Sequence, residues 1–87
     1  VMKIELIIPE FEATSSLKTE WEDGFILQSS KTSSGGLIIS GNREGLISLA
    51  RHILTLAQST VPPGYHLHYD SWNSLEDGSV EFVLEKL

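Results

Sequence analysis

The sequence predicts an α+β fold, in which a mostly antiparallel sheet of about four or five strands carries one α-helix on one face. Two observations support this fold class. One stretch, about 42–58, repeats apolar residues every three or four positions, as amphipathic helices do. Shorter stretches on both sides of it alternate apolar and polar residues, as half-buried strands do. We expect a single domain over residues 1–87, with the element order β-β-β-α-β-β, because 87 residues suffice for only one core.

Three strands are expected before the helix. Residues 2–8 alternate in polarity and stop at a proline, which cannot donate to a strand ladder. Residues 10–23 are acidic and rich in serine and threonine, so we expect a surface connection there. Residues 25–29 and 37–40 form the second and third strands, and residues 31–36 between them supply the turn of a hairpin.

The helix has a recognisable beginning and end. Asn42 suits the N-cap position, because its side chain accepts hydrogen bonds from the first free backbone N–H groups. Glu44 complements the positive end of the helix dipole. The prolines at 62 and 63 force a loop after the helix. The side expected to face the sheet carries Leu46, Leu49, Ala50, Ile53, Leu56 and Ala57, widened by Ile47 and Leu54. The opposite side carries Glu44, Ser48, Arg51, Thr55 and Gln58.

Two strands are expected after the helix. In residues 65–70 the period of two places Tyr65, Leu67 and Tyr69 on one face and His66, His68 and Asp70 on the other. Residues 71–78 form a turn region that contains Trp72. The last strand, 79–86, turns Val80, Phe82 and Leu84 inward and leaves Glu81 and Glu85 facing water.

The charge and composition narrow the classes of partner. Twelve acidic residues against six basic ones give a net charge of -6, which disfavours nucleic acids and anionic membranes and favours a basic protein. The alternative is that the acidic surface only keeps the domain soluble. The sequence contains no cysteine, which suits a reducing cytoplasm, and no stretch resembles a signal peptide or a membrane span. We therefore expect a cytoplasmic protein that binds neither nucleic acid nor membrane.

Two constellations resemble ligand sites and are weighed against simpler interpretations. His66, His68 and Asp70 project side by side from one strand within reach of one metal ion. His52 or Glu81 from another element would have to converge on that ion to complete a site. The simpler interpretation is a solvated or partner-facing sheet surface, so we expect no metal and no cofactor. The glycines beside Asn42, Arg43 and Glu44 at a helix N-terminus suggest an anion site, but the residues of a phosphate loop and the dinucleotide glycine spacing are missing, so we expect a capped strand-to-helix turn. No set of nucleophile, base and orienting acid is evident, so we expect no enzymatic activity.

Several segments together resemble one known family. They are Gly41–Leu46, Leu49–Ala57, His66–His68 and Glu81–Glu85, and they resemble the immunity protein 32 family of bacterial polymorphic toxin systems. The resemblance implies a small α+β protein that protects the producing cell by binding a toxin, without catalysis. No catalytic residue of the family transfers to this chain, and Asn42, Arg43, Glu44, His66 and His68 correspond only as motif positions.

The resulting hypothesis is that the protein neutralises a cognate, basic toxin by stoichiometric binding. Carboxylates would steer the toxin and an exposed aromatic residue would anchor it. The candidate contacts are Asp70, Trp72, Glu81 and Glu85, together with His66 and His68. Two alternatives stay open: an acidic interaction module unrelated to toxins, and a metal-dependent enzyme that uses the two histidines. The sequence leaves the oligomeric state undetermined.

Overall fold

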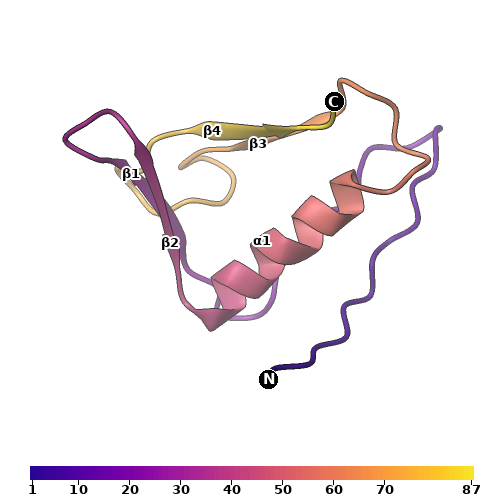
Figure 1. Ribbon diagram of the computed structural model, residues 1–87, viewed down its shortest axis with the longest axis horizontal. Helices are drawn as coiled ribbons and strands as arrows, with labels where there is room; N and C mark the ends of the chain where they lie inside the picture. The colour runs from indigo at the N-terminus through magenta and orange to yellow at the C-terminus, as the bar shows by residue number, and fades with distance from the viewer.

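The computed structural model describes residues 1–87 and contains one helix and four strands (Figure 1). In chain order the elements are β1 Leu27–Lys31, β2 Leu37–Gly41, α1 Arg43–Leu56, β3 His66–Tyr69 and β4 Phe82–Glu85. Strands β1 and β2 pair antiparallel in one sheet, and strands β3 and β4 pair antiparallel in another. Helix α1 is not long and apolar enough to cross a membrane.

The predicted sheet of four or five strands, with the order β-β-β-α-β-β, is wrong. The structure has two separate two-stranded sheets and the order β-β-α-β-β. The N-terminal stretch that was predicted as the first strand is not a strand, and residues 1–11 make no backbone–backbone hydrogen bond. Figure 1 shows this segment running beside α1, away from both sheets.

The two sheets stay separate because an irregular segment occupies the free edge of β1. The backbone N–H groups of Glu76 and Val80 donate to the carbonyl oxygens of Leu27 and Ser29, at 2.9 and 3.2 Å. Between these bonds the N–H of Ser29 donates to the Ser79 hydroxyl at 3.2 Å, where a regular ladder would use a backbone carbonyl. The segment therefore joins the two hairpins without forming a continuous sheet, and it leaves no place beside β1 for the N-terminal residues.

Helix α1 begins and ends close to the predicted positions, but it is turned differently from the prediction. Its buried residues are Gly45, Ser48, Leu49, His52, Thr55 and Leu56. Three residues expected to face the sheet are about half exposed: Leu46 at 49%, Ile53 at 47% and Leu54 at 48%. Ala50 and Ala57 are exposed as well. The helix therefore buries a partly polar side and leaves much of its apolar side open.

Hydrogen bonds explain why the polar side can be buried. The Ser48 hydroxyl donates to the carbonyl oxygen of Glu44 and accepts from the backbone N–H of Glu22, both at 2.8 Å. The Thr55 hydroxyl donates to the carbonyl oxygen of Arg51 at 2.8 Å. Buried hydroxyls that are satisfied in this way carry little desolvation cost. The segment around Glu22 therefore covers the side of α1 that was expected to face water.

The core is small and lies between α1 and the two hairpins. Its buried members are Leu27, Leu49, Tyr69 and Leu75. The partly buried residues packed against them are Trp21, Phe25, Ile39, Leu67, Phe82 and Leu84. Two stacked aromatic pairs lie within it, with ring centroids 4.2 Å apart for Trp21 and Phe25 and 4.8 Å apart for Tyr69 and Phe82. Leu67, Tyr69, Phe82 and Leu84 thus form the inner face of the β3–β4 hairpin.

Candidate protein-binding face

The outer face of the β3–β4 hairpin carries most of the predicted site residues. In the antiparallel register His66 lies opposite Glu85, and His68 lies opposite Val83. Residues opposite one another in a sheet share a face, and all four of these side chains are exposed. Glu81, just before β4, is exposed too. The structure therefore brings both histidines, Val83 and two carboxylates onto one open surface, which we call the outer face.

The two histidines lie against each other on this face. Their ring centroids are 4.9 Å apart at an interplanar angle of 78°, and Nδ1 of His66 lies 2.9 Å from the carbonyl oxygen of Gly64. Because a carbonyl oxygen only accepts, this contact places a proton on that nitrogen. No cluster of three or more potential metal ligands occurs in the structure. Both rings are exposed on the outer face.

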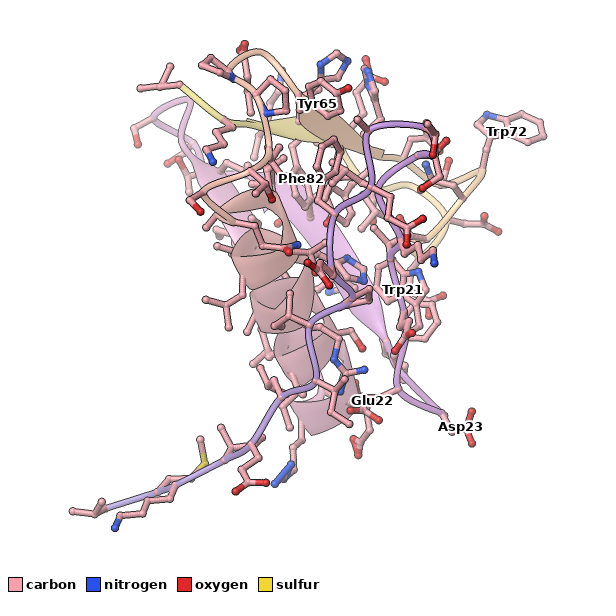
Figure 2. The ribbon with its side chains drawn as sticks, turned by 90° about the vertical axis from the view of Figure 1, so that its right-hand side faces the viewer. Trp21, Glu22, Asp23, Tyr65, Trp72 and Phe82 are labelled. Carbon is pink, nitrogen blue, oxygen red and sulfur yellow. The ribbon has the colours of Figure 1, made fainter.

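Trp72 extends from the turn that follows β3, and its side chain is 96% exposed (Figure 2). Asp70 holds this turn, because its Oδ1 accepts from the backbone N–H groups of Trp72 and Asn73 at 2.9 and 3.1 Å. The Asn73 side chain donates to the carbonyl oxygen of His68 at 3.1 Å, and buried Leu75 anchors the end of the turn. Asp70 is thus a turn residue, and it presents Trp72 from a well-braced backbone.

The part of the chain that carries the outer face is acidic. Between Arg51 and Lys86 the sequence has no lysine or arginine, and its five carboxylates are Asp70, Glu76, Asp77, Glu81 and Glu85. All of them except half-buried Asp70 are exposed. The ammonium group of Lys86 is bonded to the carbonyl oxygen of Gln58 at the end of α1. This part of the surface therefore attracts cations at long range.

The motif at the start of α1 has a structural role. Asn42 is the N-cap residue, and its Oδ1 accepts from the backbone N–H of Gly45 at 2.8 Å and from that of Ile26 at 2.9 Å. Its Nδ2 also donates to the carbonyl oxygen of Gly24 at 2.9 Å. Arg43 is exposed and forms no ion pair, and Glu44 lies in the first helical turn. Asn42 thereby ties the helix to the chain entering β1.

A buried histidine lies at the centre of the fold, in a structural role that the sequence did not predict. His52 is fully buried, and its Nε2 lies 2.7 Å from the carbonyl oxygen of Glu20. Its Nδ1 lies 2.8 Å from the Tyr69 hydroxyl. Since the carbonyl only accepts, Nε2 carries the proton and Nδ1 accepts from Tyr69. Both nitrogens of a neutral imidazole are satisfied. The only signal in the sequence is that His52 lies four residues after Ser48 and three before Thr55, which places all three on one side of a helix.

Burial sets the protonation of this pair. Desolvation lowers the pKa of His52 below its ordinary value of 6.5, the hydrogen bond to Glu20 partly opposes this, and nearby Arg51 lowers it further. Desolvation also raises the pKa of Tyr69 well above its ordinary value. Arg51 is held by carboxylates, with Nη2 2.9 Å from Oε1 of Glu22 and Nη1 3.7 Å from Oε2 of Glu20. Both His52 and Tyr69 are therefore neutral near pH 7, and their role is structural.

Acid should destabilise the fold through His52. Folding lowers the pKa of His52, so below about pH 6.5 the unfolded chain binds a proton more readily than the folded one. The contribution of His52 to the free energy of unfolding is therefore fully present above about pH 6.5 and is lost as the pH falls below that value. Urea unfolding at pH 7.5 and pH 5 measures the loss. The His52→Gln variant should lose less stability over this range than the unmodified chain. The His66→Ala/His68→Ala variant should lose as much as the unmodified chain. An equal loss in His52→Gln would exclude His52 as the titrating group.

Comparison with known proteins identifies a family. The family described as Immunity protein 32 matches residues 36–87, which is more than half of the chain. The matched region includes β2, α1, the β3–β4 hairpin and the turn that carries Trp72. No curated protein and no solved structure matches the chain. The match extends over every segment on which the resemblance was based, so the chain belongs to the immunity protein 32 family.

Proposed function

We propose that this protein neutralises a cognate bacterial toxin by direct, stoichiometric binding, and that the toxin docks on the outer face and on Trp72. Membership of an immunity protein family indicates a role in toxin immunity. The observation that carries the proposed site is an almost fully exposed tryptophan in a stretch, 52–85, that contains five carboxylates and no lysine or arginine. Inhibition by occlusion requires no chemistry from this chain.

Trp72 has the properties of an interface anchor. Tryptophan is enriched among the residues that dominate binding energy, and an exposed indole normally makes an unfavourable contact with water. Its braced turn limits the entropy lost when a partner orders the side chain. The neighbouring histidines and Val83 add a moderately apolar surface from which a partner can exclude water.

The carboxylates give the face its preference for a basic partner. Charges at the rim of an interface chiefly speed association and set partner choice, and contribute less to the lifetime of the complex. Glu81 and Glu85 lie on the outer face, while Glu76 and Asp77 lie in the exposed loop that precedes β4. Their combined field extends about 8–10 Å into a solution of physiological salt. A toxin with a basic active-site cleft therefore fits this surface best.

Co-expression tests the proposal. Cells that express the toxin encoded beside this protein should survive when the protein is present and die when it is absent. The purified pair should form a complex with equal numbers of both chains, measured by light scattering. An acidic interaction module unrelated to toxins is the competing function, and it predicts no protection. Death of cells that contain the folded, abundant protein, at the rate seen with toxin alone, would refute the proposed function.

A further inference from the structure

The exposed side of α1 forms an apolar face directly opposite the buried side of the helix. Successive helical residues are turned by about 100°, so all its members project within about 60° of the direction of Ala50. We call this the helix face; its members are Leu46, Ile47, Ala50, Ile53, Leu54 and Ala57. The only charged residue on this side is Arg43, which projects in nearly the same direction as Ala50 at the N-terminal end of the helix. Contiguous apolar surface of this kind on a small protein usually marks an interaction site.

The arrangement of the helix face is self-complementary. Ala50 lies at its centre, with larger side chains before and after it at matching spacing: Leu46 and Ile53 along one edge, Ile47 and Leu54 along the other. In an antiparallel pair about a two-fold axis at Ala50, Leu46 meets Ile53 of the second copy. Ile47 likewise meets Leu54 of the second copy. The small central alanine lets the two backbones approach closely where the axis passes.

We propose that the helix face binds the same face of a second copy of this chain, giving a two-fold symmetric dimer with antiparallel α1 helices. Charge supports this orientation. Arg43, which is exposed and unpaired, lies at one end of α1, and the last turn at the other end has no basic residue. The antiparallel arrangement separates the two Arg43 side chains and places each near the C-terminal carbonyl groups of the partner helix, one of which, that of Gln58, also accepts from Lys86.

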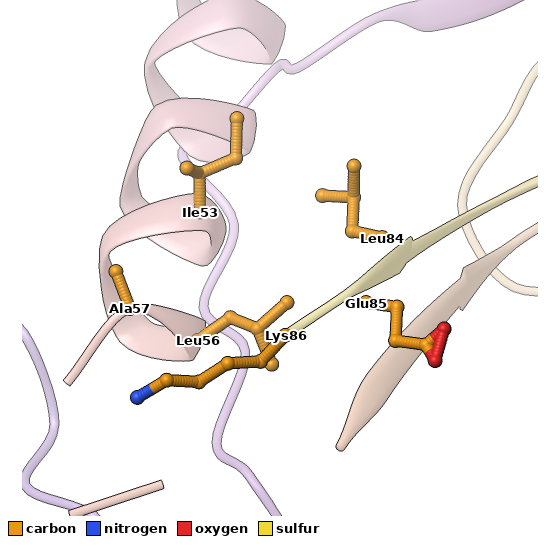
Figure 3. A pocket seen from close by; sticks show the side chains of 6 residues that line it. All are labelled: Ile53, Leu56, Ala57, Leu84, Glu85 and Lys86. Carbon is orange, nitrogen blue, oxygen red and sulfur yellow. The ribbon is translucent and has the colours of Figure 1, made fainter. Parts of the chain in front are cut away.

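An apolar groove adjoins the helix face and enlarges the contact. It has a volume of about 380 Å³ and lies between the C-terminal half of α1 and the end of β4 (Figure 3). Its lining residues are Ile53, Leu56, Ala57, Leu84, Glu85 and Lys86. In Figure 3, Ile53 and Leu84 project into it from opposite sides. Leu46 of the second copy, placed against Ile53 by the pairing, reaches this groove.

The surface charge favours a second copy over a basic toxin at this position. The helix face contains no carboxylate and lies on the side of α1 away from the core, and the charges that border it are Arg43 at one end and Glu85 and Lys86 in the adjoining groove at the other. Each copy carries a net charge of -6, so two copies repel at long range. Salt screens this repulsion. The dimer should therefore tighten as salt increases, whereas a toxin complex steered by charge should weaken.

Sedimentation velocity over a range of concentrations tests the proposal. One helix face is smaller than the ~800 Å² per partner of a standard interface, so we expect a dissociation constant on the order of 10 μM. Ala50→Glu brings two like charges together at the axis and should weaken the dimer more than tenfold. It should leave the fold intact, because Ala50 is exposed and glutamate is a good helix former. Gln28→Glu adds the same charge on β1 and should leave the dimer unchanged.

Cross-linking provides a second measurement. The chain has no cysteine, so Ala50→Cys introduces a single thiol close to the axis. Facing helices whose axes are about 9–10 Å apart bring the two Cα atoms to about 4.4–5.4 Å, which is within disulfide range. Mild oxidation should give a covalent dimer far faster for Ala50→Cys than for Gln28→Cys.

Three results would overturn the dimer: a monomer at several hundred micromolar, a dimer unaffected by Ala50→Glu, or equal cross-linking rates at the two positions. Loss of toxin capture in Ala50→Glu, with a monomeric unmodified chain, would assign the helix face to the toxin and also overturn the dimer. The dimer does not depend on the toxin-binding function. Its failure would leave protection in co-expressing cells unchanged.

Discussion

Replacing Gly45 with alanine is expected to destabilise the fold more than the same change at any other glycine of the chain. A Cβ atom at position 45 would lie 2.0 Å from the carbonyl oxygen of Ile26 and 3.2 Å from Oδ1 of Asn42. The first of these contacts is with backbone, which cannot rotate away. Relieving it separates α1 from the chain entering β1 and breaks the hydrogen bonds of the Asn42 side chain.

The expected cost of Gly45→Ala is about 3 kcal/mol or more, out of the roughly 4–13 kcal/mol available to a domain of this length. Thermal or urea unfolding measures it. Gly36→Ala is the matched control, because its closest contact is the Thr32 hydroxyl at 3.0 Å, which belongs to a side chain that can move. If Gly45→Ala unfolds at the same denaturant concentration as Gly36→Ala, the helix is not packed this closely on Ile26.

The elements with local signals could be predicted from the sequence. The helix begins at Arg43, after the Asn42 cap, because the orphan backbone N–H groups need the acceptor that an asparagine side chain supplies. Alternation in the β3 and β4 stretches predicted which residues of this hairpin face inward, because the period of a strand is two whatever it pairs with. Both signals lie within a few residues of the structure that they determine.

The elements that depend on distant partners could not be predicted. The stretch before Pro9 alternates like a strand, but the edge beside β1 is occupied by residues 76–80, about 50 positions further along the chain than β1. The rotation of α1 depends on His52 meeting Tyr69 and the backbone of Glu20, 17 and 32 positions away. A prediction from hydrophobic periodicity treats His52 and Ser48 as polar and places them toward water. It does not take into account that hydrogen bonds within the protein can satisfy such side chains when they are buried.

The candidate site was predictable where it depends on strand alternation and unpredictable where it depends on the turn after β3. Alternation placed His66, His68 and Glu85 outward, and the structure has them exposed on one face. Asp70 was grouped with them because it follows the same period, but the strand ends at Tyr69 and the Asp70 side chain holds the turn instead. Nothing in the local sequence distinguishes Trp72 from a core tryptophan, because its exposure follows from the direction of that turn.

Trp72→Ala is expected to weaken toxin binding about 30-fold, mainly by increasing the dissociation rate. Truncation of an interface anchor typically costs about 2 kcal/mol or more, and each 1.4 kcal/mol is a factor of ten in affinity. The change should leave stability unaltered, since the side chain is 96% exposed and only its backbone N–H is hydrogen-bonded. Leu37→Ala, which removes a half-exposed side chain from the other hairpin, is the matched control and should bind as the unmodified chain does.

Reversing the charge of the outer face should change the rate of association with the toxin rather than the rate of dissociation. The double variant Glu81→Lys/Glu85→Lys replaces two exposed carboxylates with ammonium groups and should slow association with a basic toxin at low salt. At high salt the difference from the unmodified chain should shrink, because screening removes the long-range part of the interaction. Surface-captured toxin and stopped-flow association measure the two rates separately. If Trp72→Ala and the charge reversal both leave the two rates unchanged, the toxin docks elsewhere on this protein and the outer face is not its binding site.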